Sequence, residues 1–242
     1  MFQITNSRVF HWFTDRSRYF SKMADARSVW PVADAVCFDV DSTVIQEEGI
    51  DELAKYCGHG EDIANMTRCA MSGSLDFRQS LAMRLDLIRP SMSQVRDFVR
   101  EKPARLTPGI KKLVEHLHRR VVDVYLISGG FRGIIGPVAL ELNIPLQNIY
   151  ANKLKFYLTG EYAGFDENEP TSKSGGKGEV IRILKKNHGY SNVVMIGDGM
   201  TDFEACPPAD AFIGYGGNVI REEVKKRCSW YVTDFNELVN AL

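Results

Sequence analysis

The sequence has no apolar run near the roughly 18–20 residues that a membrane-spanning helix needs. It also lacks an excess of either charge, because 30 basic residues stand against 31 acidic ones and the net charge is −1. No bulk electrostatic field therefore draws the protein to nucleic acid or to acidic lipid, and an anionic ligand must be bound by local groups. Internal repeats and low-complexity stretches are also absent.

Cysteine is scarce, and its pattern argues against disulfides and cysteine metal sites. The five cysteines are widely spaced and include no C-x-x-C pair, which is typical of reduced thiols. The five histidines lack the spacing of a zinc site. With 242 residues, 44% of them hydrophobic, the chain is long and apolar enough to fold as one large domain or as a domain with an insert.

Residues 1–30 differ in composition from the rest of the chain. They are rich in arginine and aromatic residues and contain only two acids, Asp15 and Asp25. Organelle transit peptides have such a composition, whereas a secretory signal would need a continuous apolar stretch. We expect a variable N-terminal extension with a short amphipathic helix on a cytoplasmic protein, and organelle targeting by residues 1–30 is the alternative.

Short apolar runs alternate with helical stretches from residue 31 onward. This alternation predicts an α/β fold, a doubly wound and mostly parallel sheet with helices on both faces. A hairpin is expected over 154–165, and Thr107 and Pro108 are expected to open a helix as N-cap and first residue. The predicted strands are 34–40, 122–127, 193–197, 211–214 and 230–232, and the predicted helices are 107–119, 131–142, 177–188 and 234–242.

Residues 48–103 interrupt this alternation because they contain no plausible strand. Ser91 and Gln94 fit a capping box at the start of one helix. We therefore predict a small helical cap domain over 48–103, inserted into a catalytic core formed by 31–47 and 104–242. The helices expected in the cap are 48–57, 61–71, 76–88 and 91–101.

Polar residues follow the predicted strands at the points where ligands bind to open α/β sheets. Asp39 and Asp41 end the first strand, a Ser-Gly-Gly segment at 128–130 ends the second, and 197–202 ends the third. Lys177 opens a later helix after two glycines. Each segment alone is compatible with an ordinary turn or helix start, but together they predict one polar site at the sheet edge.

These residue types fit magnesium-assisted phosphoryl transfer. Asp39 and Asp198 offer the carboxylate oxygens that Mg²⁺ prefers. The Ser128 hydroxyl, the N–H groups of a glycine turn and the Lys177 ammonium suit a phosphate. Asp39 can attack phosphorus, and Asp41 can act as acid and then as base if crowding and burial raise its pKa.

In this order, the segments resemble the four motifs of the haloacid dehalogenase superfamily. The motifs are carried by 38–43, 127–131, Lys177 and 197–202, and 48–103 resembles the helical cap that follows the first motif. Three further stretches resemble the phosphoserine phosphatase family within it. They are 44–53, 160–166 and 206–214, so that the resemblance runs from about Asp34 to the C-terminus.

The resemblance implies a Mg²⁺-dependent phosphatase that hydrolyses O-phospho-L-serine to L-serine and phosphate, the final step of serine biosynthesis. It implies Asp39 as the nucleophile that forms an aspartyl-phosphate and Asp41 as the general acid and base. Mg²⁺ would lie on the Asp39 carboxylate, the Asp41 backbone carbonyl and Asp198, with Asp202 orienting these groups. The implied substrate-binding residues are Glu48, Met71, Ser72, Arg84, Ser128, Gly129, Gly130, Lys177, Thr201 and Arg221.

Ser72 and Arg84 stand out among these residues. Ser72 departs from the family pattern, which usually has glycine there, so the loop would be stiffer. Arg84 borders an apolar helical stripe and has no acid three or four residues away, so it needs an anionic partner from elsewhere. A substrate carboxylate would serve, and so would Asp51 or Asp62 of the cap.

Other functions remain as alternatives. A phosphatase of the same superfamily acting on a sugar or nucleotide phosphate is the runner-up. A signalling receiver domain is also phosphorylated on aspartate but needs no helical insert, and a dehalogenase would use Asp39 without Asp41 or a metal. We expect phosphoserine as the small-molecule partner, with neither nucleic acid nor membrane, and the sequence leaves a homodimer open.

Overall fold

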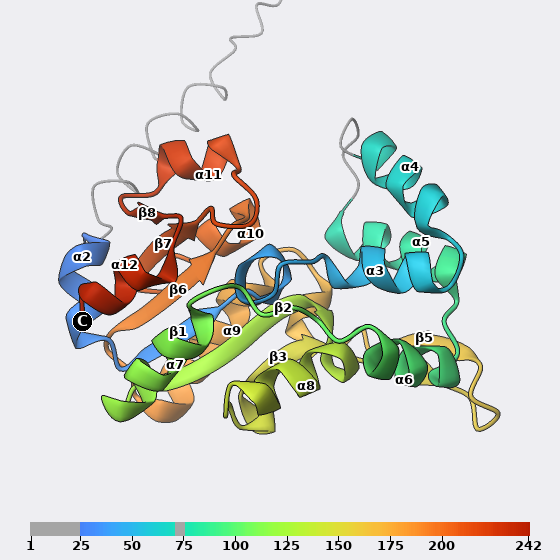
Figure 1. Cartoon of the computed structure of the whole chain (residues 1–242), viewed down its shortest axis with the longest axis horizontal. Helices are drawn as coiled ribbons and strands as arrows, with labels where there is room; N and C mark the ends of the chain where they lie inside the picture. Colours follow the sequence, from blue (N-terminus) through green and yellow to red (C-terminus); the bar gives the residue numbers. More distant parts are fainter. Residues whose placement is uncertain (1–24, 71–75) are drawn as a thin grey trace, which may run out of the picture.

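A six-stranded sheet forms the centre of the molecule in the computed structural model, which describes residues 25–70 and 76–242 (Figure 1). All of its strand pairs are parallel, and the strand order is β3-β2-β1-β6-β7-β8. The strands are β1 (Ala35–Phe38), β2 (Asp123–Phe131), β3 (Ile149–Asn152), β6 (Val193–Gly197), β7 (Ala211–Tyr215) and β8 (Tyr231–Val232). The predicted doubly wound α/β fold is confirmed.

Both faces of the sheet are covered by helices because its strands are apolar on both sides. In β1, Val36 and Phe38 join one buried cluster, whereas Ala35 and Cys37 join another on the opposite face. The first cluster includes side chains of α2 (Ala26–Val29), α7 (Ile110–Arg119), α8 (Arg132–Glu141) and α12 (Phe235–Asn240). The second includes side chains of α9 (Gly176–His188), α10 (Met200–Phe203) and α11 (Glu222–Arg227).

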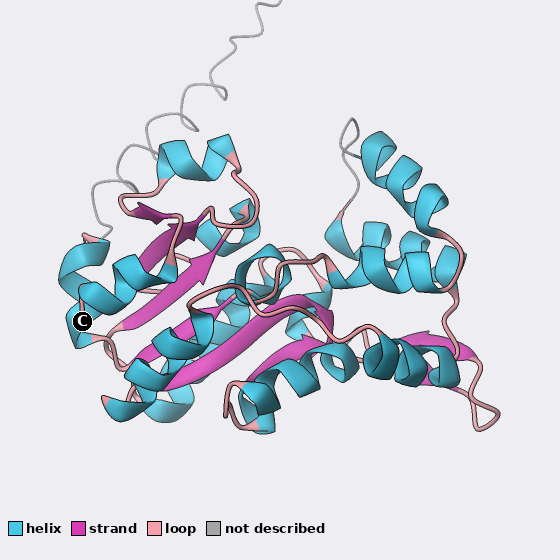
Figure 2. Cartoon of the chain, viewed as in Figure 1, coloured by secondary structure: helices cyan, strands magenta, loops and turns pink. Residues whose placement is uncertain are grey.

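Four helices lie within residues 48–103, and Figure 2 shows no strand among the described residues of this segment. The predicted capping box of Ser91 and Gln94 is confirmed. A hairpin formed by β4 (Leu154–Phe156) and β5 (Tyr162–Phe165) packs beside the last helix, as the Met92 N–H donates to Gly160 O at 2.8 Å. The four helices are α3 (Gly49–Tyr56), α4 (Gly60–Ala70), α5 (Phe77–Ile88) and α6 (Met92–Glu101).

Two local predictions are wrong. Residues 128–130 do not form a glycine turn, because β2 continues to Phe131 and its register against β3 shifts in this stretch. Thr107 is not a helix N-cap, since α7 begins at Ile110 after Gly109, whose φ is 85°. The Thr107 hydroxyl instead accepts a hydrogen bond from Asn218 at 2.7 Å, which ties two loops together.

Some short elements were not predicted. β3, α10 and α11 contain only four, four and six residues, too few for a periodic pattern to stand out.

The central position of β1 matters most for function. From β1, the sheet continues through β2 and β3 on one side and through β6, β7 and β8 on the other. The strand order therefore reverses at β1, and a crevice opens beyond its carboxyl end. Within the described ranges, no helix is long and apolar enough to cross a membrane.

Candidate active site

Asp39 lies directly after β1, at the point where the strand order of the sheet reverses. The residue is only 8% exposed, and its carboxylate is held through one oxygen. Oδ1 accepts from the Val40 N–H at 2.7 Å and lies 2.7 Å from Lys177 Nζ. Oδ2 makes no hydrogen bond within the described part of the chain, so a fixed carboxylate with one uncommitted oxygen stands at the floor of the crevice.

Lys177 brings two carboxylates together from the first turn of α9. Its ammonium lies 2.7 Å from Asp39 Oδ1 and 2.5 Å from Asp202 Oδ1. The two acids outweigh burial and raise the lysine's pKa, so it stays charged. Gly197 makes this pairing possible, because a Cβ at that position would overlap the Asp202 side chain.

Three carboxylates offer a place for a metal ion. One oxygen each of Asp39, Asp198 and Asp202 lies within 4.8 Å of the others, and all three residues are buried. The Asp202 oxygens are already engaged by Lys177 and by the Gly199 N–H at 3.0 Å. Asp39 and Asp198 are therefore better placed as ligands, and Asp202 as the group that orients Lys177.

The charge balance of this region also favours a cation. Burial and the Asp39 charge raise the pKa of Asp198, although Arg221 Nε at 2.6 Å opposes this. Two cations, Lys177 and Arg221, contact the group, which leaves an excess of three negative charges when every acid is ionised. An oxygen-only donor set with excess negative charge suits a hard divalent ion. The acids counted are Asp39, Asp41, Glu48, Asp198 and Asp202.

Asp41 stands two residues beyond Asp39 and has a different environment. Its Oδ1 accepts from the Gly49 N–H at 2.6 Å, and its Oδ2 accepts from the Ser128 hydroxyl at 3.2 Å. Burial, followed by the charges of Asp39 and Glu48, raises the pKa of Asp41 to about 7. Near neutral pH it can therefore both donate and accept a proton.

Glu48 connects the helical segment to the crevice. Its Oε1 accepts from the Ser42 hydroxyl at 2.8 Å and lies 3.4 Å from Arg221 Nη2. Burial raises the pKa of Glu48, and the Ser42 hydrogen bond opposes this. Ser42 was not predicted as a site residue, because it lies in an irregular turn with a φ of 54° that no periodic sequence pattern signals.

A cavity of about 480 Å³ joins this crevice to the inner side of α5. Arg84 lines it, with Asp39, Glu48 and Lys177 elsewhere in the same wall. The buried Arg84 Nε has no hydrogen-bond partner within the described residues, and Nη2 reaches only the Ser80 hydroxyl at 3.1 Å. No ion pair joins Arg84 to Asp51 or Asp62 there, so the alternative of a structural pair with these acids is not what the structure contains.

The remaining predicted residues fall into three groups. Gly129, Gly130, Thr201 and Arg221 line the cavity, and Ser128 lies behind it against Asp41. Met71 and Ser72 lie outside the described residues. Ser174, Gly175, Gly176, Gly199 and Met200, which belong to the polar segments singled out in the sequence, also line the cavity. The other lining residues were not predicted, because isolated side chains outside these segments form no motif. They are Ile50, Phe77, Leu81, Thr171, Lys173 and Glu223.

Comparison with known proteins gives a consistent result. A model of haloacid dehalogenase-like hydrolases matches residues 33–210. Phosphoserine phosphatase of Bos taurus is 59% identical over 219 residues, covering 90% of this chain and 97% of that protein. The chloroplastic phosphoserine phosphatase of Arabidopsis thaliana is 51% identical over 216 residues, 88% of this chain and 73% of that protein.

A solved structure supports the same relationship. It is described as a phospho-aspartyl intermediate analogue of phosphoserine phosphatase, is 25% identical, and superposes with a TM-score of 0.74 over 87% of this chain and 99% of that chain. The strand-end carboxylates, the lysine beside them and the helices over the cavity fit these matches. The chain belongs to the phosphoserine phosphatase family of the haloacid dehalogenase-like hydrolases.

Proposed function

We propose that this protein hydrolyses O-phospho-L-serine to L-serine and phosphate, the final step of serine biosynthesis. One observation carries the proposal beyond the family. A single cavity contains a carboxylate nucleophile at one end and, on the α5 side, an arginine whose buried Nε has no partner in the described ranges. Phosphoserine has a phosphate at one end and a carboxylate at the other, so it complements both groups.

Mg²⁺ is the metal that these residues suit best. The Asp39 and Asp198 carboxylates and the Asp41 backbone carbonyl would hold it, since hard cations prefer oxygen ligands. When bound, it neutralises negative charge on the phosphoryl oxygens and allows a carboxylate to approach phosphorus. The excess of acids around Asp39 supports this proposal independently of the relatives.

In the first chemical step, the Asp39 carboxylate attacks phosphorus and forms an aspartyl-phosphate while the bond from phosphorus to the serine oxygen breaks. Asp41 donates a proton to that oxygen, so that serine leaves as a neutral alcohol. Lys177, Ser128 and Gly129 hold the phosphoryl oxygens, and Lys177 also fixes Asp39 through Oδ1. A raised pKa of about 7 keeps Asp41 partly protonated for this task.

In the second step, water attacks the phosphorus of the aspartyl-phosphate. Asp41, now ionised, accepts a proton from the water, and the bond between phosphorus and Asp39 breaks. Phosphate is released and both carboxylates return to their starting states. The Gly49 N–H at 2.6 Å stabilises the ionised form of Asp41 between the two steps.

The amino-acid end of the substrate would lie under α5. Arg84 would bind the substrate carboxylate, and Glu48 would bind its ammonium. Gly130, Thr201 and Arg221 would complete the phosphate side, and Met71 and Ser72 would close the entrance. We also keep 48–103 as the proposed cap domain, with the core in 31–47 and 104–242.

The cell compartment and the assembly are further proposals. We place the enzyme in the cytoplasm, and the chloroplastic Arabidopsis relative keeps organelle targeting by residues 1–30 as the alternative. A homodimer also stays a prediction.

The test is a phosphate-release panel over a dozen small phosphomonoesters, with Mg²⁺ and after EDTA treatment. We expect phosphoserine to be the preferred substrate and EDTA to abolish turnover. Preference for a sugar or nucleotide phosphate would establish the alternative phosphatase. Full activity in the metal-free protein would contradict the metal proposal.

A further inference from the structure

Three consecutive residues at the start of α5 each contact a different segment around the phosphate end of the cavity. We propose that Asp76, Phe77 and Arg78 act together as a clasp that holds α5 over the crevice and so retains the substrate. They are positioning residues, since none of them is placed against the reacting atoms. The effect on substrate retention rests on the proposed function, whereas the clasp itself does not.

Arg78 makes the most contacts across this boundary. Its Nη2 donates to Glu167 O at 2.9 Å and to the Ser172 hydroxyl at 2.9 Å, and Nε donates to Ser172 O at 3.4 Å. Nη1 lies 3.5 Å from the Glu167 carboxylate. Ser172 is fully buried, so the two contacts to this residue are partly shielded from water, whereas the two contacts to Glu167 are exposed. One guanidinium thus ties α5 to the loop that precedes α9.

Asp76 precedes α5 as its N-cap residue but does not cap it. Its side chain makes no capping hydrogen bond to the helix and instead accepts from the Ser174 hydroxyl at 2.9 Å. An aspartate at this position ordinarily stabilises its own helix by accepting from the backbone N–H groups of the first turn. Here the carboxylate instead links α5 to the loop before α9, because its partner Ser174 lies three residues before Lys177.

Phe77 makes the third contact, between α5 and the end of β2. A Cβ built on Gly129 would lie 2.8 Å from Phe77 Cζ, so the ring rests directly on the glycine backbone. Gly129 lies beside Ser128 at the end of β2 and lines the cavity. The absence of a side chain at 129 therefore allows α5 to approach the segment that we propose binds phosphate.

The three anchors converge on the phosphate side of the cavity. Thr171 and Ser174 line it, and Gly176 packs so closely on Pro170 that a Cβ there would overlap the Pro170 carbonyl. The loop held by Arg78 is thereby coupled to the start of α9, which carries Lys177. Release of the clasp would separate α5 from this edge without removing any group that carries out the chemistry.

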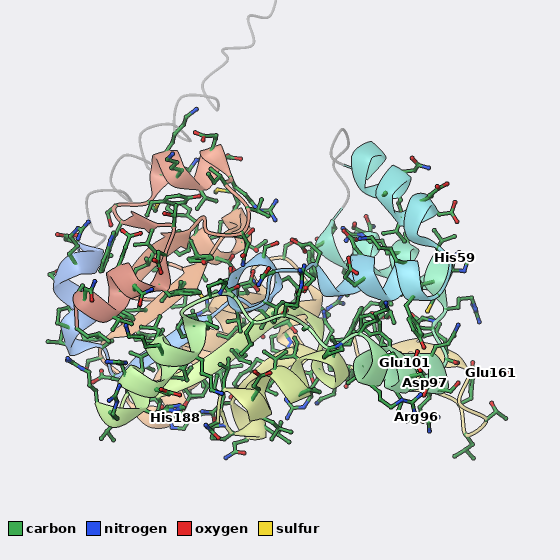
Figure 3. All side chains as sticks on the ribbon, viewed as in Figure 1. His59, Arg96, Asp97, Glu101, Glu161 and His188 are labelled. Carbon is green, nitrogen blue, oxygen red and sulfur yellow. The ribbon has the colours of Figure 1, made fainter. Side chains whose placement is uncertain are left out.

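Kinetics give one readout. The Arg78→Ala variant should raise KM for phosphoserine about tenfold, because a smaller fraction of the protein is closed over the substrate, while kcat changes much less. Arg78→Lys should recover part of the loss. Arg96→Ala is the matched control, since Arg96 lies on α6, is 72% exposed and, among the described residues, pairs only with its neighbour Asp97 (Figure 3). This variant should leave both constants unchanged.

Hydrogen exchange followed by mass spectrometry tests the clasp without using activity. In the full-length Arg78→Ala protein, deuterium uptake should rise over 126–131, where Phe77 packs on Gly129, as well as over 167–174. In Phe77→Leu, uptake should rise over 167–174, whose hydrogen bonds to α5 come from Arg78 and Asp76. The second variant keeps the test valid if the first unfolds, and Arg96→Ala should show neither change.

A rise confined in each variant to the segment that the altered side chain contacts would overturn the clasp, because the three contacts would then be independent. An unchanged KM in Arg78→Ala, with phosphoserine turnover intact in the wild type, would overturn its role in retention. Failure of the wild type to hydrolyse phosphoserine would contradict the proposed function and leave the exchange result standing.

Discussion

Arg84 should decide whether the enzyme distinguishes phosphoserine from phosphoethanolamine, which is the same molecule without the carboxylate. In the structure the buried Nε of Arg84 has no partner among the described residues, and Nη2 has only the Ser80 hydroxyl. A substrate carboxylate would satisfy it. With phosphoethanolamine the guanidinium stays desolvated and unpaired, so the wild type should process this compound poorly.

The magnitude follows from the number of hydrogen bonds. A hydrogen bond to a charged group contributes about 1.5–3 kcal/mol, and a guanidinium and a carboxylate can form two of them. Two bonds correspond to about 10²–10⁴-fold discrimination in kcat/KM. Arg84→Ala should remove this factor from phosphoserine and leave phosphoethanolamine turnover nearly unchanged, so that the two values converge.

The assay is kcat/KM for both compounds in the wild type, Arg84→Ala, Glu48→Gln and the control Arg96→Ala. Glu48→Gln should impair both substrates because both carry the ammonium, and the control should impair neither. Equal turnover of both compounds by the wild type would refute the reasoning. So would an equal loss for both compounds in Arg84→Ala, which would make Arg84 a structural residue.

Three further predictions address the catalytic end. Asp41→Asn should slow turnover by about 10²–10⁴-fold in steady-state phosphate release, as expected for lost acid–base help, and a smaller effect would remove Asp41 from the mechanism. The pKa of Asp41 is raised from 3.8 to about 7, so the contribution of this group to the stability of the metal-free protein should be greatest below pH 3.8. Stability should fall by up to about 1.4 kcal/mol per pH unit as the pH rises from 3.8 to about 7. Urea unfolding with EDTA at several pH values should show a shallower slope for Asp41→Asn, and identical slopes would contradict the raised pKa. Gly197→Ala should abolish activity and lower the melting temperature because its Cβ overlaps Asp202, whereas Gly133→Ala, with no atom within 4 Å of the new Cβ, should do neither.

The catalytic end could be predicted from the sequence because it depends on a few polar residues that directly follow the strands. Asp39, Asp41 and Asp198 each follow an apolar strand, and parallel strands bring their carboxyl ends to one edge. Lys177 was expected at this edge as a charge for the phosphate, and the structure shows that it also pairs with Asp39. The structure adds the second contact, to Asp202, and the glycine at 197 that makes room for it.

Contacts between α5 and the core could not be predicted in this way. Arg78 and Ser172 are 94 positions apart, and Asp76 and Ser174 are 98 apart, so no local pattern relates them. The glycine turn expected at 128–130 failed for a related reason. Glycines permit a turn but do not require one, and the pairing of Ile127 and Phe131 with β3 on either side keeps this segment within the strand.

The identity of the nucleophile is the central claim, and trapping the covalent intermediate tests it most directly. The enzyme would be mixed with radiolabelled phosphoserine and Mg²⁺, quenched in acid, digested, and mapped by peptide mass spectrometry. We expect a phosphoryl group on Asp39 that is absent from the Asp39→Asn protein. Label on Ser128, or phosphate release at full rate by Asp39→Asn, would contradict it.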